Sequence, residues 1–274
     1  GAGNDPNIGR EASEMSRDEI EALLDDDTKM LFVTAGMGGG TGTGAAPVAA
    51  KMAKDKGILT VGIVTMPMGR EGRRRKLQAL AGIDELKKCV DTLILISTDK
   101  LRDQYGNMKL SEAFKKADDV LATAARGIAE IITVPGYVNV DFEDVKTVMK
   151  DSGLALMGCG VGKGQNRIDD AIEAAINSPL LNDFEVNTAQ KVLLNITFAF
   201  YENGIEMDDL NTLTNKIRDA LGKFTMFKRG IIWNDDPDAD DTIRVTVVAT
   251  GFEYNKLNKI TNVDLSNLII LDNE

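Results

Sequence analysis

A glycine-rich segment near the start of the chain constrains its fold more than any other feature. Gly36–Gly44 reads GMGGGTGTG and lies between a buried apolar run, Met30–Ala35, and a helix-like run, Ala45–Lys56. Glycines let the backbone adopt positive φ and approach a ligand closely. A strand, a glycine loop and a helix N-terminus direct backbone amides at one point. The segment predicts an anion site, most naturally for phosphates, with Thr41 and Thr43 as hydroxyl donors; a merely flexible turn is the alternative.

Two familiar phosphate-binding sequences do not fit this segment. A P-loop needs Gly, four residues and then Gly-Lys-Ser/Thr, and no lysine follows the glycines here. The dinucleotide fingerprint G-x-G-x-x-G is out of register as well. A second glycine run, Gly158–Gly164, fails both patterns. A dinucleotide-dependent enzyme of ordinary α/β type is therefore disfavoured.

Strand-like and helix-like runs alternate along the chain. Strands are predicted at Met30–Ala35, Ile58–Thr65 and Thr92–Ile96, with helices at Ala45–Lys56 and Arg73–Lys88 between them. This rhythm indicates a parallel sheet with crossover helices. The longest helical pattern is Ser111–Ile132, with apolar residues at spacings of three and four. Further elements are predicted at Leu154–Gly158, Ile168–Ile176, Lys191–Ala199, Asp208–Leu221, Gly230–Trp233 and Thr242–Thr250.

The predicted fold class is therefore α/β, with a Rossmann-like parallel-sheet domain over residues 1–132. The long helix at its end joins it to a second α/β domain over residues 133–252. Residues 253–274 form a tail, whose run Asn267–Leu271 is a closing strand or a partner-binding segment, with packing against the body preferred.

Composition excludes several kinds of function. The 274 residues include 32 basic and 43 acidic ones, and the net charge of -11 argues against nucleic acid as a partner. The chain has no histidine, so chemistry must rest on carboxylates, amides, hydroxyls, Lys/Arg or a hard cation. No apolar run is long enough for a membrane helix, and no signal peptide is visible. Cys89 and Cys159 lie in apolar stretches, which is typical of a reduced cytoplasmic protein.

Several motifs together resemble the tubulin/FtsZ family of GTPases. Residues 38–44 (GGGTGTG) are similar to the family's signature, and Gly1–Pro6 (GAGNDP) resembles its loop around the terminal phosphate. Arg70–Arg75 (REGRRR) and Val138–Met149 (VNVDFEDVKTVM) resemble two further family segments, the second being its synergy loop. Ser178–Leu181 and Val245–Phe252 resemble its second domain. The likeness covers nearly the whole chain as far as Phe252.

The resemblance implies a GTP/GDP site with Mg²⁺ accompanying GTP. The residues implied at the α- and β-phosphates are Gly39, Gly40, Thr41, Gly42 and Thr43, and the flanking Gly38 and Gly44 are implied as further nucleotide-binding residues. Ala2, Gly3 and Asn4 would lie by the γ-phosphate. Glu71 would bond the ribose, and Arg75 would lie near the sugar or phosphates. Without the family, Arg70–Lys76 is a basic cluster opening a helix, which a bound anion would justify; a solvated basic face is the alternative.

The guanine contacts are implied on the long helix and at a strand end. Phe114 and Asp118 are four residues apart and so share one helix face. In the family the corresponding pair stacks on guanine and accepts its ring NH and amino hydrogen bonds; from the residues alone, a core position is preferred for Phe114 over a base platform. Thr98 stands where the family commonly has a guanine-contacting Asn, which indicates weaker or rearranged base binding.

A group of acids follows the long helix. Asp141 is predicted as the N-cap of the next helix, with Asp144 on the same side of its first turn. These acids, with Asn139, could orient and polarise a water or hold a cation; capping alone is the alternative for Asp141. A helix of ~30 Å separates them from the glycine segment. In the family, such acids complete the site of the next subunit in a head-to-tail homopolymer, so hydrolysis would depend on assembly.

The resemblance also implies strands before Gly1 that are not in this sequence, so an incomplete GTPase is expected, with Met30–Ala35 at an open sheet edge. The preferred function is a polymerising division-ring GTPase at the cytoplasmic division site, with other ring proteins as partners and no membrane insertion. The alternative is a non-catalytic relative that acts as an interaction or filament-capping module.

Overall fold

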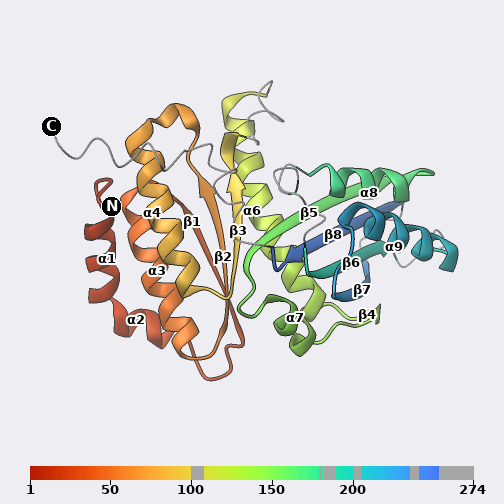
Figure 1. Cartoon of the computed structure of the whole chain (residues 1–274), viewed down its shortest axis with the longest axis horizontal. Helices are drawn as coiled ribbons and strands as arrows, with labels where there is room; N and C mark the ends of the chain where they lie inside the picture. The colour runs from red at the N-terminus through yellow and green to blue at the C-terminus, as the bar shows by residue number, and fades with distance from the viewer. Residues whose placement is uncertain (100–107, 179–180, 182–188, 200–204, 235–240, 253–274) are drawn as a thin grey trace.

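The computed structural model describes residues 1–99, 108–178, 181, 189–199, 205–234 and 241–252. Its first half contains α1 (Pro6–Met15), α2 (Arg17–Ala22), β1 (Met30–Gly36), α3 (Gly40–Asp55), β2 (Leu59–Met66), the 3₁₀ turn η1 (Gly69–Glu71), α4 (Arg73–Cys89) and β3 (Thr92–Ser97). Its second half contains α6 (Leu110–Thr133), β4 (Gly136–Val138), α7 (Phe142–Met149), β5 (Gly153–Lys163), α8 (Arg167–Ile176), β6 (Lys191–Ala199), α9 (Met207–Leu221), β7 (Met226–Asn234) and β8 (Thr242–Thr250). The α/β class is confirmed (Figure 1).

The described strands form one continuous sheet in the order β1-β2-β3-β5-β8-β6-β7-β4. β1, β2, β3 and β5 are parallel neighbours, whereas β8 runs antiparallel to both β5 and β6. The two halves meet between β3 and β5, through the pairs Thr92↔Gly153, Leu93↔Leu154 and Ile94↔Ala155. The sequence predicted two α/β units, and the three residue pairs between β3 and β5 join the strands of both units into one sheet.

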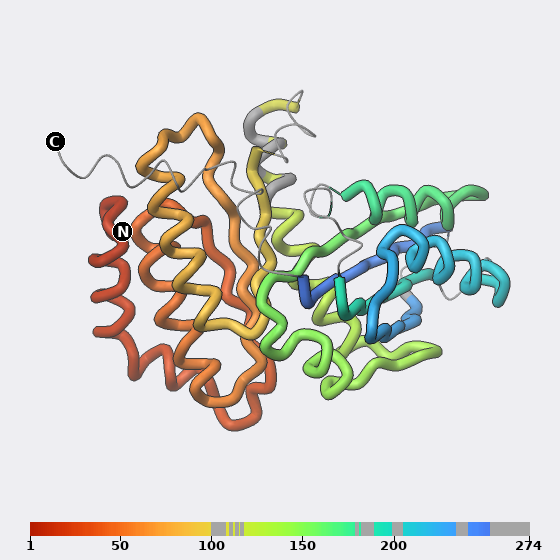
Figure 2. The backbone as a smooth tube through the Cα atoms, viewed as in Figure 1, coloured from red at the N-terminus to blue at the C-terminus, as the bar shows by residue number. Residues whose placement is uncertain are grey.

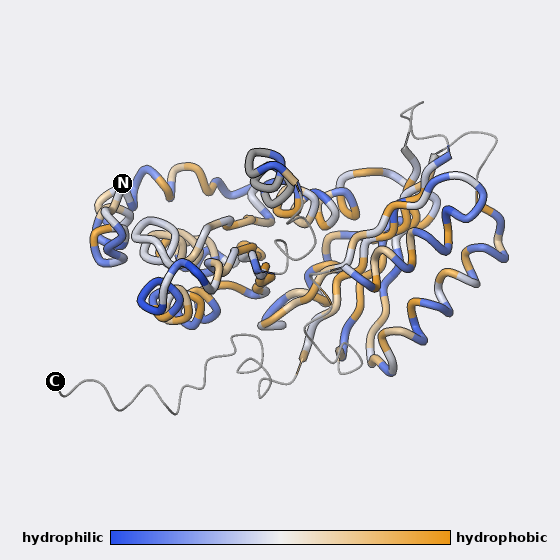
Figure 3. Tube along the Cα trace, turned by 90° about the horizontal axis from the view of Figure 1, so that it is seen from above, coloured by the Kyte–Doolittle hydropathy of each residue, from blue (hydrophilic) through white to orange (hydrophobic). Residues whose placement is uncertain are grey.

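Helices cover both faces of the first half of the sheet. Along β3, Leu93 and Leu95 face a core cluster with α3 and α4, whereas Ile94 and Ile96 face α6 and α7. This alternation is what a strand buried on both faces requires. The α6–α7 cluster also contains Met157 of β5 and so joins the halves. In the second half, α8 and α9 pack on β6 and β8, and apolar residues dominate the strands (Figure 3).

The long helix α6 runs through the middle of the molecule, between two opposite edges of the sheet (Figure 1). It begins at the edge where β1, β2 and β3 end, and it finishes beside α7 at the opposite edge (Figure 2). Its 24 residues span about 36 Å at 1.5 Å per residue. Its apolar face is buried against the sheet through residues such as Ala124, Ile128 and Ile131. Among the described helices, none combines the length and apolar character needed to cross a membrane.

Three predicted boundaries were wrong by four residues or more, and one of them is the strand expected from Gly230, which begins at Met226. The helix expected from Ala45 begins at Gly40, so most of the glycine segment forms its first turn. The strand expected to end at Gly158 continues to Lys163, so the second glycine run is mostly strand. A Cβ at Gly158 would lie 2.2 Å from the carbonyl oxygen of Ala175. These glycines therefore let α8 pack directly on β5.

Four of the described elements were not predicted: α1, α2, η1 and β4. For α1 the signals were present, because Asp5 accepts a hydrogen bond from the Asn7 amide as N-cap and Pro6 occupies the first helical position. The strands at Lys191–Ala199 and Thr242–Thr250 are confirmed residue for residue. The tail 253–274 and much of the segment 178–181 lie outside the described residues.

Candidate functional site

The chain begins with a tight turn that presents its backbone to solvent. The amide of Asp5 donates to the carbonyl of Ala2 at 2.8 Å, and Gly3 and Asn4 both have positive φ, at 54° and 64°. Two successive positive φ values are typical of a type I′ turn. Ala2 is buried, while Gly3 and Asn4 are exposed. The turn thus exposes backbone of positive φ at the start of α1.

The glycines of the first turn of α3 pack against this N-terminal turn and against β1. A Cβ at Gly40 would lie 2.7 Å from the carbonyl oxygen of Asp5, and one at Gly44 would lie 2.0 Å from that of Pro6. A Cβ at Gly42 would lie 2.2 Å from the carbonyl oxygen of Gly36. Close packing therefore explains three glycines that the sequence analysis attributed to a ligand. Gly39 differs, because no atom lies within 4 Å of a Cβ built there.

The two threonines of this segment have different environments. Thr43 is buried, and its Oγ1 accepts a hydrogen bond from the amide of Gly38 at 2.9 Å. Gly38 has a φ of 91°, a conformation that glycine adopts readily. Thr41 is exposed. Thr43 thus shapes the loop, and Thr41 is the hydroxyl that a ligand in solvent can reach.

The N-terminus of α3 remains available to an anion. No side chain caps it, and its first turn contains no acidic residue. The first amides of a helix have no partner within the helix, and the helix dipole is positive there. Gly39, the N-cap residue, faces open space. The local geometry is therefore that of an anion site.

Gln78 is a site residue that sequence reasoning missed. From α4, its Nε2 donates to the carbonyl of Asn4 at 2.9 Å and to that of Gly39 at 3.3 Å. One side chain thus bridges the N-terminal turn and the start of α3. The available signal was its spacing, because Gln78 follows Arg75 by three residues and shares its helix face.

Glu71 and Arg75 form an ion pair near the glycine segment. Arg75 Nη1 is 2.8 Å from Glu71 Oε2, and Glu71 Oε1 accepts the amide of Met68 at 2.8 Å. The α4 N-terminus carries Arg73, Arg74 and Arg75, although basic residues there oppose the helix dipole. Both predicted residues are exposed. A bound anion would offset this accumulation of positive charge.

The residues implied at the base lie at the same edge of the sheet. Thr98 follows β3, and its hydroxyl donates to the carbonyl of Met66 at 2.6 Å, so its proton is already committed. Asp99 accepts the amide of Gly69 at 2.9 Å. Asp118 is exposed on the first half of α6. Phe114 belongs to the same helix, but its side chain lies outside the described part.

The acids gather at the far end of α6. Asp141 is the N-cap of α7, as predicted, and its Oδ1 accepts the amide of Asp144 at 2.7 Å. Asn139 Oδ1 accepts the amide of Gly136 at 2.8 Å. Asp144 Oδ1 lies 2.5 Å from Nζ of Lys228 on β7. The structure therefore brings the three predicted residues together and separates them from the glycine segment by the length of α6.

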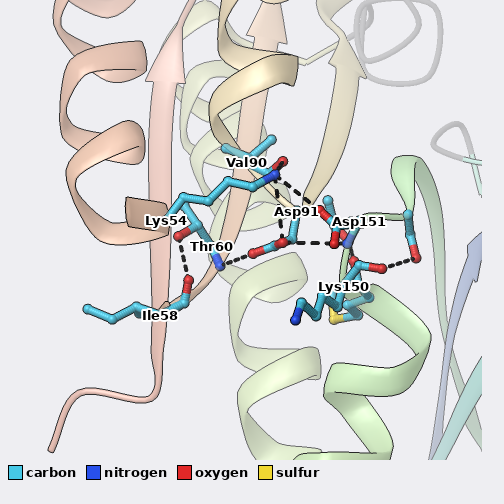
Figure 4. Close-up of polar contacts among 10 residues, drawn as sticks. Lys54, Ile58, Thr60, Val90, Asp91, Lys150 and Asp151 are labelled. Atoms are coloured by element: carbon cyan, nitrogen blue, oxygen red, sulfur yellow. Dashed lines mark hydrogen bonds and ion pairs between the residues drawn. The ribbon is translucent and has the colours of Figure 1, made fainter. Parts of the chain in front are cut away.

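A buried carboxylate connects the two halves near α7 (Figure 4). Asp91 accepts the amide of Thr60 at 2.9 Å and that of Asp151 at 3.4 Å. Lys54 Nζ lies 3.8 Å from Asp91 Oδ1 and 3.3 Å from Asp151 Oδ1, and it donates to the carbonyl of Val90. Thr60 and Lys54 belong to the first half, whereas Asp151 follows α7. This cluster fixes the end of α7 to the first half.

Several titratable groups away from the glycine segment have shifted pKa values. Burial raises the pKa of the Cys89 and Cys159 thiols, so both stay protonated at neutral pH. The hydrogen bond from Arg10 to Glu85 raises the pKa of Arg10. That contact joins α1 to α4 and so anchors the helix that follows the N-terminal turn.

Comparison with known proteins decides the family. Over 99% of its length the chain is 46% identical to "Cell division protein FtsZ" of Wigglesworthia glossinidia brevipalpis, of which it covers 70%. The chain belongs to the tubulin/FtsZ family. Residues 1–106 match "Tubulin/FtsZ family, GTPase domain", and residues 153–253 match "FtsZ family, C-terminal domain". The FtsZ resemblance read from the motifs is confirmed.

Further FtsZ proteins agree in sequence and in fold. The FtsZ of Buchnera aphidicola (strain APS) is 47% identical over 96% of the chain, which covers 68% of that protein. A solved structure described as "FtsZ dimer, empty (M. jannaschii)" matches with a TM-score of 0.82 and 39% identity. It covers 92% of this chain, which spans 71% of that one. The chain thus carries the GTPase domain and the C-terminal domain of FtsZ.

Proposed function

We propose that the chain binds GTP where β1, β2 and β3 end, and that it hydrolyses GTP when an adjacent subunit supplies acids to that edge. The observation that carries this proposal is the opposed placement of the two groups along α6, at the glycine segment and at α7. About 36 Å of helix is too far for side chains of one subunit to bridge. A head-to-tail contact that repeats without closing gives a filament. The related M. jannaschii FtsZ is described as a dimer.

The first turn of α3 supports the phosphate assignment. Its uncapped amides and the open space at Gly39 suit the α- and β-phosphates, which Gly38–Gly44 would hold. The turn at Ala2, Gly3 and Asn4 would lie by the γ-phosphate. Thr43 would act by shaping the loop, and Thr41 would donate to a phosphate oxygen.

The sugar and base would lie along the same edge. Glu71 would hydrogen-bond the ribose, and Arg75 would lie near the sugar or phosphates. Phe114 and Asp118 would hold guanine, because a carboxylate accepts hydrogen bonds from both the ring NH and the neighbouring amino group, a paired donor edge that adenine lacks. Thr98 would meet the base with a hydroxyl whose proton is already donated to Met66. Thr98 could therefore contact the base only as a hydrogen-bond acceptor, through its hydroxyl oxygen.

Mg²⁺ fits this site as a companion of the nucleotide. Among the described residues, no group of three or more Cys, Asp or Glu side chains is arranged to hold a metal. Mg²⁺ commonly keeps several waters and binds substrate phosphates. When bound, it would neutralise charge on the phosphates. The residues that contact the phosphates would remain those of the α3 N-terminus and the N-terminal turn.

The acids at α7 would act on a water in the neighbouring subunit. Asp141 is engaged as the cap of α7, and Asp144 is held close to it. Carboxylates accept hydrogen bonds from water and can remove its proton. Asn139 would fix the preceding turn through its bond to the Gly136 amide. Asp144 would be the principal acid and Asp141 its support.

The two family matches fall on either side of the segment that contains α6 and α7. This supports a division into a nucleotide-binding domain at 1–132 and a polymerisation domain at 133–252, followed by the tail at 253–274. We assign the filament to the division site in the cytoplasm, with other division-ring proteins as partners. Neither nucleic acid nor direct membrane insertion belongs to this proposal.

A second candidate is an interaction module that caps filaments without turnover. It is favoured by β1, which pairs with β2 alone among the described strands and whose residues are partly exposed. An open strand edge is a template for pairing with another chain. In that case the protein would slow the assembly of an active filament and would hydrolyse no GTP itself.

Replacing Asp144 separates these candidates. The unsubstituted chain should hydrolyse GTP at a rate per subunit that rises with protein concentration, and polymer should sediment with GTP. Asp144→Ala should bind a fluorescent GTP analogue normally but lose at least ~100-fold in turnover. Asp208→Ala, an exposed acid in the first turn of α9, is the matched control and should behave as the unsubstituted chain does. Undiminished turnover in Asp144→Ala would refute the assignment.

A further inference from the structure

The proposed catalytic acid has a basic partner on another element. Lys228 Nζ lies 2.5 Å from Asp144 Oδ1, and the two side chains are 38% and 31% exposed. The second oxygen, Oδ2, makes no hydrogen bond or ion pair with another described residue. The carboxylate is therefore held through one oxygen, and the other remains open to a ligand.

The strand pattern directs Lys228 toward α7. Met226 of β7 packs against the core cluster that contains Val145 and Val148 of α7. Side chains two residues apart on a strand point to the same face, so Lys228 follows Met226 toward α7. The neighbouring strand β6 contributes Lys191, whose Nζ donates to the carbonyl of Thr147 at 3.0 Å. Two lysines thus tie α7 to the starts of β6 and β7, but only Lys228 contacts the acid.

An ion pair this exposed contributes little to the stability of a fold. Its effect on geometry can be much larger, because a small displacement of a reacting group lowers the rate strongly. The backbone amide of Asp144 is already fixed by the Asp141 carboxylate, and the ion pair with Lys228 fixes the carboxylate of Asp144 itself. The contact is therefore better suited to orienting the carboxylate than to stabilising the chain.

We propose that Lys228 is a positioning residue for Asp144. By holding Oδ1 it keeps Oδ2 directed away from β7, where the water of an adjacent subunit's nucleotide would be met. This inference rests on the proposed function, because it requires that Asp144 serve a neighbouring site. Lys228 itself touches neither the water nor the nucleotide.

The test compares Lys228→Met, Lys228→Arg and Lys146→Met in the full chain. Lys146 lies on α7 and pairs with Glu143 at 3.5 Å, so its replacement removes a similar charge without contacting Asp144. For each variant, GTP turnover over a range of GTP concentrations, polymer sedimentation and thermal unfolding are measured. Lys228→Met should lose about tenfold in kcat with KM, polymer mass and melting temperature unchanged, since only orientation is lost. Lys228→Arg should recover most of the rate, and Lys146→Met should match the unsubstituted chain.

Each other outcome identifies what has failed. Full turnover in Lys228→Met, alongside loss of turnover in Asp144→Ala, would overturn this inference and leave the proposed function intact. Loss of polymer in Lys228→Met would also overturn it, because Lys228 would then belong to the subunit contact. Absence of turnover in the unsubstituted chain would overturn the proposed function and this inference with it.

Discussion

The hydroxyl of Thr43 accepts a hydrogen bond from the amide of Gly38 at 2.9 Å, in a buried position. This bond ties the first turn of α3 back to the loop before it. Gly38 has positive φ, so the loop needs such a restraint to keep its amides aligned. Thr43 therefore supports a phosphate site from behind, whereas sequence reasoning assigned it to direct phosphate contact.

Replacing Thr43 by Val should weaken nucleotide binding through the loop. The buried Gly38 amide would lose its acceptor, which costs about 1–3 kcal/mol of stability. Urea unfolding measures that loss, and titration with a fluorescent GTP analogue should show a parallel drop in affinity. Thr43→Ser keeps the hydroxyl and should retain most of both. Equal affinity in Thr43→Val and Thr43→Ser would contradict this role.

Gln78→Leu should reduce affinity for GTP more than for GDP. The side chain donates to the carbonyls of Asn4 and Gly39, so its loss frees the turn proposed to lie by the γ-phosphate. Two hydrogen bonds of about 1 kcal/mol each set the scale at roughly 30-fold. Competition binding with both nucleotides measures the ratio. Gln165→Leu, an exposed glutamine between β5 and α8, is the control, and an unchanged ratio in Gln78→Leu would count against the bridge.

Two glycine replacements should affect different properties of the chain. Gly44→Ala places a methyl group 2.0 Å from the Pro6 carbonyl oxygen and should destabilise the chain by about 1–3 kcal/mol or more. Gly39→Ala meets open space at a φ of -96°, so stability should be unchanged while nucleotide affinity falls. Urea unfolding combined with nucleotide titration measures both. A stability loss in Gly39→Ala equal to that in Gly44→Ala would refute this distinction.

Asp91→Ala should destabilise the contact between the two halves of the molecule. The variant removes the acceptor of the Thr60 amide and one partner of Lys54. Breaking a buried, paired carboxylate costs about 3 kcal/mol, and urea unfolding measures it. Asp151→Ala removes the exposed partner of the same lysine and should cost well under half as much. Equal losses of unfolding free energy in the two variants would contradict the structural role proposed for the buried Asp91 carboxylate.

Local sequence signals predicted much of the fold. The apolar runs at β6 and β8 and the helical spacing of α6 predicted the bounds of these elements within a residue or two. In each of them the apolar residues recur with the repeat of the strand or helix that they form, because the core buries one side of it. Asp141 was predicted as a cap from its neighbours alone, and it is one. The start of α3 was missed because glycine propensity opposes a helix, whereas packing against Pro6 and Asp5 requires glycine.

The remaining features depend on contacts between distant residues. Lys228 reaches Asp144 from a strand 84 positions later, and no local pattern marks it. Gln78 touches the N-terminal turn across 74 positions. The joining of two predicted units into one sheet rests on three residue pairs between β3 and β5. Such contacts follow from topology, so sequence periodicity could not predict them.

The central claim is that the acids of one subunit complete the nucleotide site of the next, and mixing two inactive variants tests it most directly. Asp144→Ala retains the proposed pocket without its acid, and Gly39→Asp retains the acids but places a carboxylate in the open space proposed for phosphate. Each variant alone should show little GTP turnover. Their mixture should recover a substantial fraction, because a Gly39→Asp subunit can present its Asp144 to the pocket of an Asp144→Ala subunit. A mixture as inactive as its components would contradict the account.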